Sequence, residues 1–220
     1  VLRATTTMVA ALAKHVEEIH VFGSVEAARQ RANAVGIFPK PLLCGEEKCL
    51  KPEGFDLGNS PGGFEADLRG QALFMSTTNG TRAILAAQEA RMMLVGALVN
   101  ASAVAKAAAA SGLDITLLCA GTNGQVAMED VLGAGAVIAA LKRLTTLQFD
   151  GDLPLMAHRL FETEKNDLRG ALRQTQGGRN VIAAGLEEDI DFAASLDRFP
   201  RVVGVVEGAI VRGQRDQRAL

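Results

Sequence analysis

Tryptophan and tyrosine are absent from the sequence, and aromatic residues make up only 4% of its 220 residues. A hydrophobic core must therefore be built from aliphatic side chains. Val, Ile, Leu and Ala dominate the apolar segments, and such segments are typical of parallel strands buried beneath helices. The sequence is 48% apolar and 22% charged, which excludes a disordered chain and predicts one globular domain over 1–220, with two related halves as an open alternative.

Cysteine is scarce, and its spacing excludes two kinds of site. Cys44, Cys49 and Cys119 are an odd number without paired spacing, so a disulfide framework is not expected. Too few soft ligands surround Cys44 and Cys49 for a zinc site. We therefore expect a cytoplasmic protein. No apolar run reaches the roughly 20 residues that a membrane helix needs.

The chain has no large excess of positive or negative charge, because the formal net charge is −2 and no basic run occurs. Nucleic acid and membranes are therefore not expected as partners. Asp216 interrupts the arginines between Arg212 and Arg218, and this stretch is interpreted as a frayed tail. The sequence is compatible with a homodimer.

Strand-like and helix-like segments alternate along the chain, which predicts an α/β fold with a mostly parallel sheet. The expected strands are Glu18 to Phe22, Pro41 to Cys44, Ala72 to Ser76, Met92 to Ala97, Asp114 to Cys119, and Val202 to Val206. One helix is expected to begin at Ser24. The other expected helices span Thr81 to Ala90, Ala101 to Ala110, Val126 to Leu144, Asp152 to Leu172, and Asn180 to Ser195.

Two identical turns each separate an expected strand from an expected helix. They are Thr78-Asn79-Gly80 and Thr122-Asn123-Gly124. Ligands of parallel sheets bind beyond the carboxyl ends of the strands, and a helix N-terminus there attracts anions. The turns are therefore candidates for binding phosphate, although Asn and Gly also form ordinary turns. Their similarity raises the alternative of an internal duplication.

Other polar segments suit the same anion. Arg3 with Thr5, Thr6 and Thr7 combines a guanidinium with three hydroxyls at an expected helix start. Asn100-Ala101-Ser102 is a further strand-to-helix turn of weaker specificity. For the segment from Arg3 to Thr7 taken alone, capping and ordinary β-branched packing are the favoured explanation.

Carboxylates near these turns are candidates for Mg²⁺ chemistry. Glu46 and Asp56 lie in a long Gly-rich loop, 45–63, while Glu129 and Asp130 lie early in the helix after the second turn. Magnesium uses a few carboxylates together with water and substrate phosphate oxygens. The alternatives are a helix-dipole contact for Glu129 and Asp130, a turn for Asp56, and a solvated charge for Glu46.

The histidines show no catalytic pattern, and Cys119 is expected to be a buried small hydrophobe at the end of a strand. A catalytic thiol is the alternative for Cys119, because a polar turn follows it.

Longer strings resemble the 2-phosphosulfolactate phosphatase family from the first residue to about position 206. They begin with Val1-Leu2-Arg3-Ala4-Thr5-Thr6-Thr7 and Glu53-Gly54-Phe55-Asp56-Leu57-Gly58-Asn59-Ser60-Pro61. Thr77-Thr78-Asn79-Gly80-Thr81-Arg82 and Cys119-Ala120-Gly121-Thr122-Asn123-Gly124 follow. The last are Gly177-Gly178-Arg179-Asn180 and Gly185-Leu186-Glu187-Glu188-Asp189-Ile190.

The resemblance implies a three-layer α/β/α fold particular to the family and a Mg²⁺-dependent phosphatase. The implied reaction converts 2-phospho-3-sulfolactate into 3-sulfolactate and phosphate, a step of coenzyme M biosynthesis. Family members carry an Asp before the first string, at the end of an initial strand, so that strand and its carboxylate are expected to be missing here.

The expected site combines the motifs with the resemblance. The catalytic candidates are Arg3, Thr78, Asn79, Thr122, Asn123 and Glu129. The candidates for substrate binding are Thr5, Thr6, Thr7, Asn59, Ser60, Gly80, Thr81, Asn100, Ser102 and Gly124. The candidates for binding Mg²⁺ are Glu46, Asp56 and Asp130. Two rival hypotheses are a non-catalytic binder of small anions and a phosphatase for another phosphorylated hydroxy acid.

Overall fold

The computed structural model describes residues 1–36 and 39–214, which fold around one mixed sheet. The strands are β1 (Glu18–Phe22), β2 (Leu42–Gly45), β3 (Ala72–Ser76), β4 (Met93–Val95), β5 (Gly204–Glu207) and β6 (Ile210–Gly213). Their order across the sheet is β2-β3-β1-β6-β5-β4. The α/β class is therefore confirmed.

The sheet is mixed, so the expectation of a mostly parallel sheet is wrong. The β1–β3 and β2–β3 pairs are parallel, whereas the β1–β6, β5–β6 and β4–β5 pairs are antiparallel. The difference comes from the hairpin of β5 and β6, which lies between β1 and β4. A three-layer arrangement of the whole chain and an internal duplication stay predictions.

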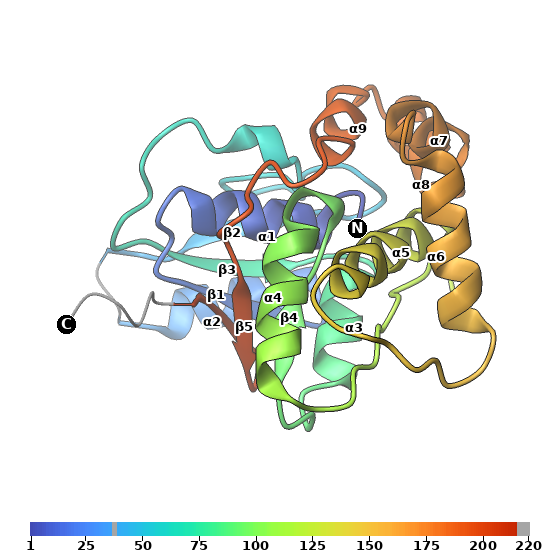
Figure 1. Ribbon diagram of the computed structural model, residues 1–220. Coiled ribbons are helices and arrows are strands. Elements are labelled where there is room, and N and C mark those ends of the chain that lie inside the picture. The colour runs from blue at the N-terminus through green and yellow to red at the C-terminus, as the bar shows by residue number, and fades with distance from the viewer. Residues whose placement is uncertain (37–38, 215–220) are drawn as a thin grey trace.

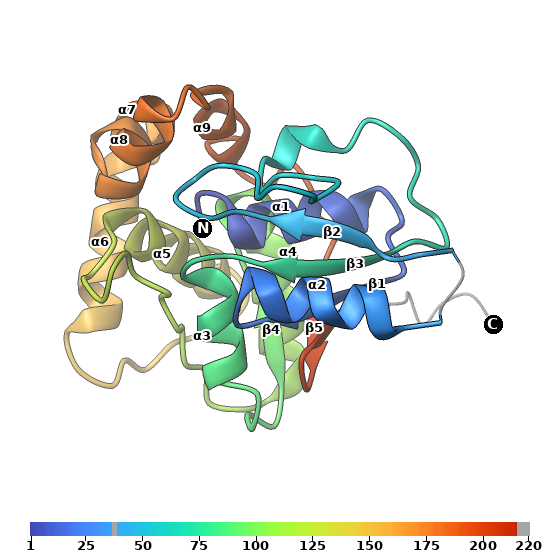
Figure 2. The same cartoon turned by 180° about the vertical axis from the view of Figure 1, so that it is seen from behind.

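Helices lie on both faces of the parallel strands. Helix α1 (Ala4–Ala13) crosses one face (Figure 1), and α2 (Val25–Ala34) lies on the other (Figure 2). The first helix is buried almost all round, as expected of an apolar helix inside a core. Met8 and Val9 pack with Ile19 and Leu73 on its side of the sheet, while Phe74 packs on the other side.

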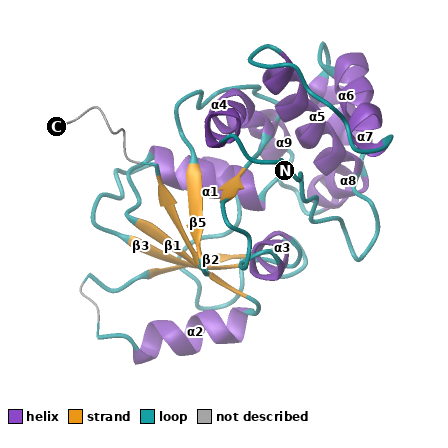
Figure 3. Ribbon diagram, turned by 60° about the horizontal axis from the view of Figure 1, so that its bottom comes forward, coloured by secondary structure: helices purple, strands orange, loops and turns teal. Residues whose placement is uncertain are grey.

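A second core is formed by the helices between β4 and β5. These are α4 (Ala101–Ser111), α5 (Met128–Lys142), α6 (Leu153–Glu164), α7 (Leu168–Gln174), α8 (Gln176–Ala183) and α9 (Glu188–Ala193). Helices α5 to α8 gather to one side of the sheet (Figure 3). The short helix α3 (Gly80–Ala86) follows β3, and the 3-10 turns η1 (Pro61–Gly63) and η2 (Leu98–Asn100) precede Phe64 and α4. No helix within 1–36 and 39–214 combines the length and apolarity of a membrane span.

Local signals were read correctly for several elements. Strands β1 and β3 have the predicted bounds, and the Ser24 side chain caps α2 by accepting a hydrogen bond from the Ala27 N–H at 3.1 Å. Each of the two long helices expected after residue 151 is divided. Asp167 caps the start of α7, and Gly185, with φ of 73°, interrupts the second helix between α8 and α9.

The strand expected at Asp114 to Cys119 is absent, and the segment has no regular secondary structure. Residues 113–118 line the same cleft as β4, and no strand among the described residues pairs with this segment. Conversely, Arg212 lies in β6 and its guanidinium pairs with Glu18 at 2.7 Å, so the frayed tail does not begin there. Residues 215–218 lie outside the described residues.

The close contact between β2 and β3 depends on Gly45. Its φ is 153°, and a Cβ atom there would lie 2.0 Å from the Ser76 carbonyl oxygen. We expect Gly45→Ala to lower the free energy of unfolding by more than about 1 kcal/mol, because a backbone atom must move. Urea unfolding measures the change. Gly62→Ala, where a Cβ meets open space, is the control, and equal stabilities of the two variants would contradict this reading.

Candidate active site

A cleft of about 1240 Å³ opens beside the carboxyl ends of β2 and β3. Its lining includes Arg3 at the start of α1, Asn79 in the first Thr-Asn-Gly turn and Asn123 in the second. The prediction that these three segments meet in one pocket is therefore confirmed. Helices α5 and α8 complete the polar part of the cleft with Glu129, Asp130, Gly177 and Asn180.

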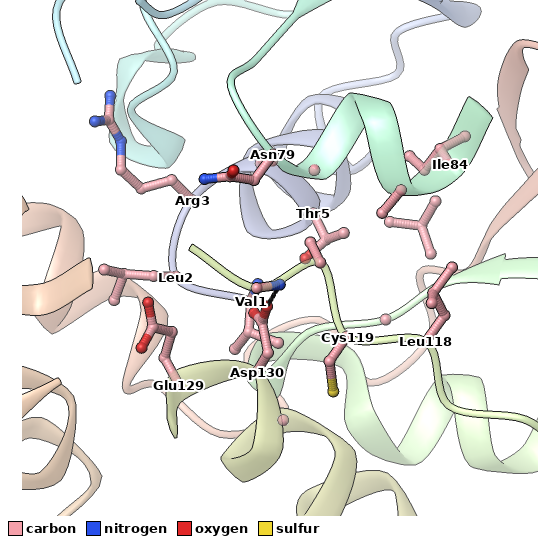
Figure 4. Close-up of a pocket in the computed structure, with 18 of the residues that line it drawn as sticks. Val1, Leu2, Arg3, Thr5, Asn79, Ile84, Leu118, Cys119, Glu129 and Asp130 are labelled. Carbon is pink, nitrogen blue, oxygen red and sulfur yellow. Dashed lines mark hydrogen bonds and ion pairs between the residues drawn. The ribbon is translucent and has the colours of Figure 1, made fainter. Parts of the chain in front are cut away.

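The cleft has a polar and an apolar part. Arg3, Asn79 and Glu129 lie toward one side of the close-up, and Ile84 and Leu118 lie toward the other (Figure 4). The apolar part is formed by β4, α3, α4 and residues 113–118. The whole volume exceeds the roughly 300–1,000 Å³ of a usual small-molecule pocket, so a small anion would occupy only the polar part.

The first Thr-Asn-Gly turn is fixed by hydrogen bonds on both sides. The buried Thr81 hydroxyl accepts from the Thr77 N–H at 3.0 Å and donates to the Thr77 carbonyl at 2.8 Å. The Glu46 carboxylate accepts from the Thr78 N–H at 2.7 Å and from the Thr78 hydroxyl at 3.1 Å. Asn79 and Gly80 line the cleft between these anchors, whereas Thr81 lies behind them in the core.

Glu46 also organises the loop that follows β2. Its Oε2 accepts from the Cys49 N–H at 2.9 Å, so both carboxylate oxygens hold backbone N–H groups. Asp56, another expected metal ligand, accepts from the Leu43 N–H at 2.8 Å and does not line the cleft. Within 1–36 and 39–214, no group of three or more His, Cys, Asp or Glu side chains is arranged to hold a metal ion. Glu46, Asp56 and Asp130 therefore do not form a joint metal site.

The Arg3 guanidinium is buried and largely occupied by protein contacts. Its Nε lies 3.1 Å from Asp189 Oδ2 and donates to the Asn59 carbonyl at 3.1 Å. Its Nη1 donates to the Cys49 carbonyl at 3.0 Å. Its Nη2 makes no hydrogen bond to the residues that the structure describes.

The second Thr-Asn-Gly turn is built differently from the first. Thr122 and Gln125 exchange backbone hydrogen bonds at 3.0 Å each, and Asn123 has φ of 52°. Gly121 donates its N–H to Asp130 Oδ2 at 2.9 Å, which ties the turn to α5. Asp130 Oδ1 accepts from the amine of Val1 at 2.9 Å.

Charge and hydrogen bonds stabilise the ionised form of Asp130. Burial raises the pKa of this carboxyl, whereas the hydrogen bonds from the N–H groups of Gly121 and Ala120 lower it. Asp130 Oδ2 is therefore engaged by the backbone of the second turn.

Glu129 differs from the other carboxylates of the cleft. Only 4% of its surface is exposed, and its buried Oε2 has no hydrogen-bond partner among residues 1–36 and 39–214. Thr5 Oγ1 and Asn59 Oδ1 are likewise buried without partners in this part of the chain, and both residues line the same cleft. Buried polar atoms are nearly always paired in folded proteins, so three such oxygens at one cleft indicate a place for a polar ligand.

Several expected binding residues lie away from the cleft and have structural partners. The Thr7 hydroxyl donates to the Asn59 carbonyl, and Ser60 donates to Asp189. Asn100 bonds the backbone at Ala97, Val95 and Val202, and Ser102 contacts Asp197. The residues outside the cleft lining are Thr6, Thr7, Asp56, Ser60, Thr81, Asn100, Ser102 and Gly124.

Cys119 is exposed, contrary to the expectation of a buried thiol. Its neighbourhood does not activate it, because partial burial of the sulfur and the nearby Asp130 raise the pKa of the thiol. Cys44 is buried, and this burial raises its pKa to about 12. The alternative of a catalytic thiol thus receives no support from the charges around Cys119.

The site also contains residues to which the sequence motifs assigned no role. Gly177 and Asn180, both in α8, line the same cleft as Glu129. Thr175 caps this helix by accepting from the Gly178 N–H at 2.9 Å. The run Thr175-Gln176-Gly177-Gly178 is a signal for a helix start with close neighbours, but it does not identify the element that approaches.

The fold and the cleft define an α/β protein with a polar site beside the ends of parallel strands, suited to a small anion. A sequence model of the 2-phosphosulpholactate phosphatase family matches residues 1–208. The chain therefore belongs to this family of phosphoric monoester hydrolases.

Similar proteins cover almost the whole chain, and each is named "Probable 2-phosphosulfolactate phosphatase". The protein from Caldanaerobacter subterraneus subsp. tengcongensis is 34% identical over 98% of this chain and 88% of its own length. The protein from Thermotoga petrophila is 35% identical over 96% and 88%, respectively. The protein from Deinococcus radiodurans is 39% identical over 94% and 86%.

The anchoring role of Glu46 can be tested by Glu46→Ala. We expect the free energy of unfolding to fall by about 1.5–3 kcal/mol, because three donors lose a charged acceptor. The exposed neighbour provides the matched control Glu47→Ala, which should change stability by less than about 0.5 kcal/mol. Urea unfolding of both variants checks this, and a similar small loss in both would contradict the anchoring role.

Proposed function

We propose that this chain is a Mg²⁺-dependent phosphatase that hydrolyses 2-phospho-3-sulfolactate to 3-sulfolactate and phosphate, the reaction that would place it in coenzyme M biosynthesis. The observation that carries the proposal is the group of unpartnered buried oxygens on Thr5, Asn59 and Glu129 in one cleft. The names of similar proteins supply the substrate class.

The first task of the site is to hold an anion with fixed donors. Thr78 and Asn79 come from one turn, Thr122 and Asn123 from the other, and Arg3 offers Nη2. Because Glu46 and Asp130 fix the backbone of the two turns, their donors need little reorganisation when charge develops on the phosphoryl oxygens.

The donor set also fits a magnesium ion. Mg²⁺ is usually held by one or two protein carboxylates, water and substrate phosphate oxygens, so three clustered side chains are not required. Glu129 would hold it through its unpartnered Oε2, with Asp130 as the neighbouring carboxylate. The ion would neutralise charge on the transferred phosphoryl group. Asp56 has no part in this proposal, because it lies outside the cleft lining.

The proposal predicts that Glu129→Gln lowers kcat for phosphate release from 2-phospho-3-sulfolactate by about 10²- to 10³-fold, because the ion loses its charged ligand. The exposed residue Glu89 provides the control Glu89→Gln, which should retain the unmodified rate. Phosphate release is measured with and without Mg²⁺. Equal rates for Glu129→Gln and the unmodified chain would overturn the assignment of Glu129.

A substrate comparison separates this function from its rivals. We expect kcat/KM to fall for a phosphorylated hydroxy acid that has a hydrogen atom in place of the sulfonate, because the donors facing that group lose their partner. Equal values would favour a phosphatase of broader substrate range. Binding of the phosphorylated acid without phosphate release would instead support an anion-binding protein.

Cys119→Ser provides a further test of the mechanism. Because the pKa of the thiol is raised, the thiolate needed for nucleophilic attack is scarce near neutral pH, and we expect the variant to keep kcat within about twofold. A loss of kcat by orders of magnitude with unchanged stability would restore the catalytic thiol.

A further inference from the structure

Gly177 lies next to the carboxylate on which the proposed function depends. It is the second residue of the eight-residue helix α8. A Cβ atom built there would lie 1.9 Å from Glu129 Oε1, 2.9 Å from its Cδ and 3.6 Å from its Oε2. These are the three nearest atoms, so the space left by the missing side chain is filled by the Glu129 carboxylate.

The neighbouring Gly178 packs most closely against backbone. A Cβ atom at Gly178 would lie 1.9 Å from the Leu172 carbonyl oxygen and 2.9 Å from its carbon. Those atoms belong to the backbone of α7 and cannot swing aside. At Gly177, by contrast, the obstructed atoms are the end of a side chain that can rotate, so a methyl group would displace the carboxylate and leave the helix in place.

The position of Glu129 also explains why displacement would matter. Its side chain is 4% exposed, its Oε2 has no partner, and it lies near the amino ends of α5 and α8, where helix dipoles favour negative charge. A shift of about 1 Å in a catalytic group can cost roughly a hundredfold in rate.

We infer that Gly177 is a positioning residue: the absence of its side chain sets the place of the Glu129 carboxylate at the amino end of α8. This inference rests on the proposed function for its effect on rate, but the contact itself can be tested without any activity. Glycine offers no helix-forming advantage over alanine here, whereas its missing Cβ leaves room for the Glu129 carboxylate.

The first test is Gly177→Ala in the full chain. Phosphate release from 2-phospho-3-sulfolactate should fall about a hundredfold in kcat, and the thermal shift produced by Mg²⁺ should shrink. The midpoint of urea unfolding should stay the same or rise, because alanine favours the helix. Gly178→Ala is the control, and its midpoint should fall because a backbone atom is obstructed.

The second test is a double-mutant cycle on stability with Glu129→Ala. Without the carboxylate, Gly177→Ala should raise the urea midpoint by more than it does in the unmodified chain, which gives a measurable coupling. Gly178→Ala should lower the midpoint equally in both backgrounds. Equal effects of Gly177→Ala in the two backgrounds, or an unchanged kcat and Mg²⁺ shift, would overturn the inference.

The proposed function and the positioning role of Gly177 can be refuted separately. Absence of phosphate release by the unmodified chain would refute the proposed function while the stability cycle still decides whether Gly177 and Glu129 interact. Activity with no coupling in the cycle would support the function and refute the positioning role.

Discussion

A buried ion pair between Arg3 and Asp189 joins parts of the chain that lie far apart in sequence. The Arg3 guanidinium bonds the backbone at Cys49 and Asn59, and Ser60 donates to the Asp189 carboxylate at 2.9 Å. Burial raises the pKa of Asp189, and the Ser60 hydrogen bond and the Arg3 charge oppose the rise without cancelling it. Because a lone charge in this place would be costly, the start of α1, the loop after β2 and α9 depend on one another. The loop residues that face the cleft are positioned by this pair.

The carboxylates of the cleft divide into two kinds. Glu46 and Asp130 accept hydrogen bonds from backbone N–H groups and so hold the two Thr-Asn-Gly turns in place. Oε2 of Glu129 has no such partner among the described residues, although this side chain is also buried. A site for an anion and a cation needs both kinds, because rigid donors must be held by acceptors that the ligand does not displace. The proposed chemistry depends on this difference between Glu129 and the two turn-holding carboxylates more than on any single motif.

The sequence allowed a partial prediction of the fold and of the site. Strand β3 was predicted from its apolar run, and its side chains are indeed buried on both faces. The convergence of Arg3, Asn79 and Asn123 followed from their places at strand or helix ends. Local pattern could not reveal which strands would pair, so the hairpin of β5 and β6 and the mixed sheet were missed. Likewise, Asn100 lies in a polar turn of the kind that binds ligands. Its side chain, however, donates a hydrogen bond to the Val202 carbonyl, which gives it a structural role. The role of Gly177 could not be predicted, because its neighbour Glu129 is remote in the chain.

The place of the last hairpin in the sheet affects how the protein is made. Strands β5 and β6 separate β1 from β4, so the sheet order β2-β3-β1-β6-β5-β4 cannot be completed from the first half of the chain. During synthesis β1 can pair with β6, and β4 with β5, only after residues 204–213 have left the ribosome. Pairings this distant in sequence slow folding, since a long loop must close before any contact stabilises it. A nascent chain stopped before β5 therefore has an incomplete sheet, and its exposed strand edges are natural binding sites for chaperones.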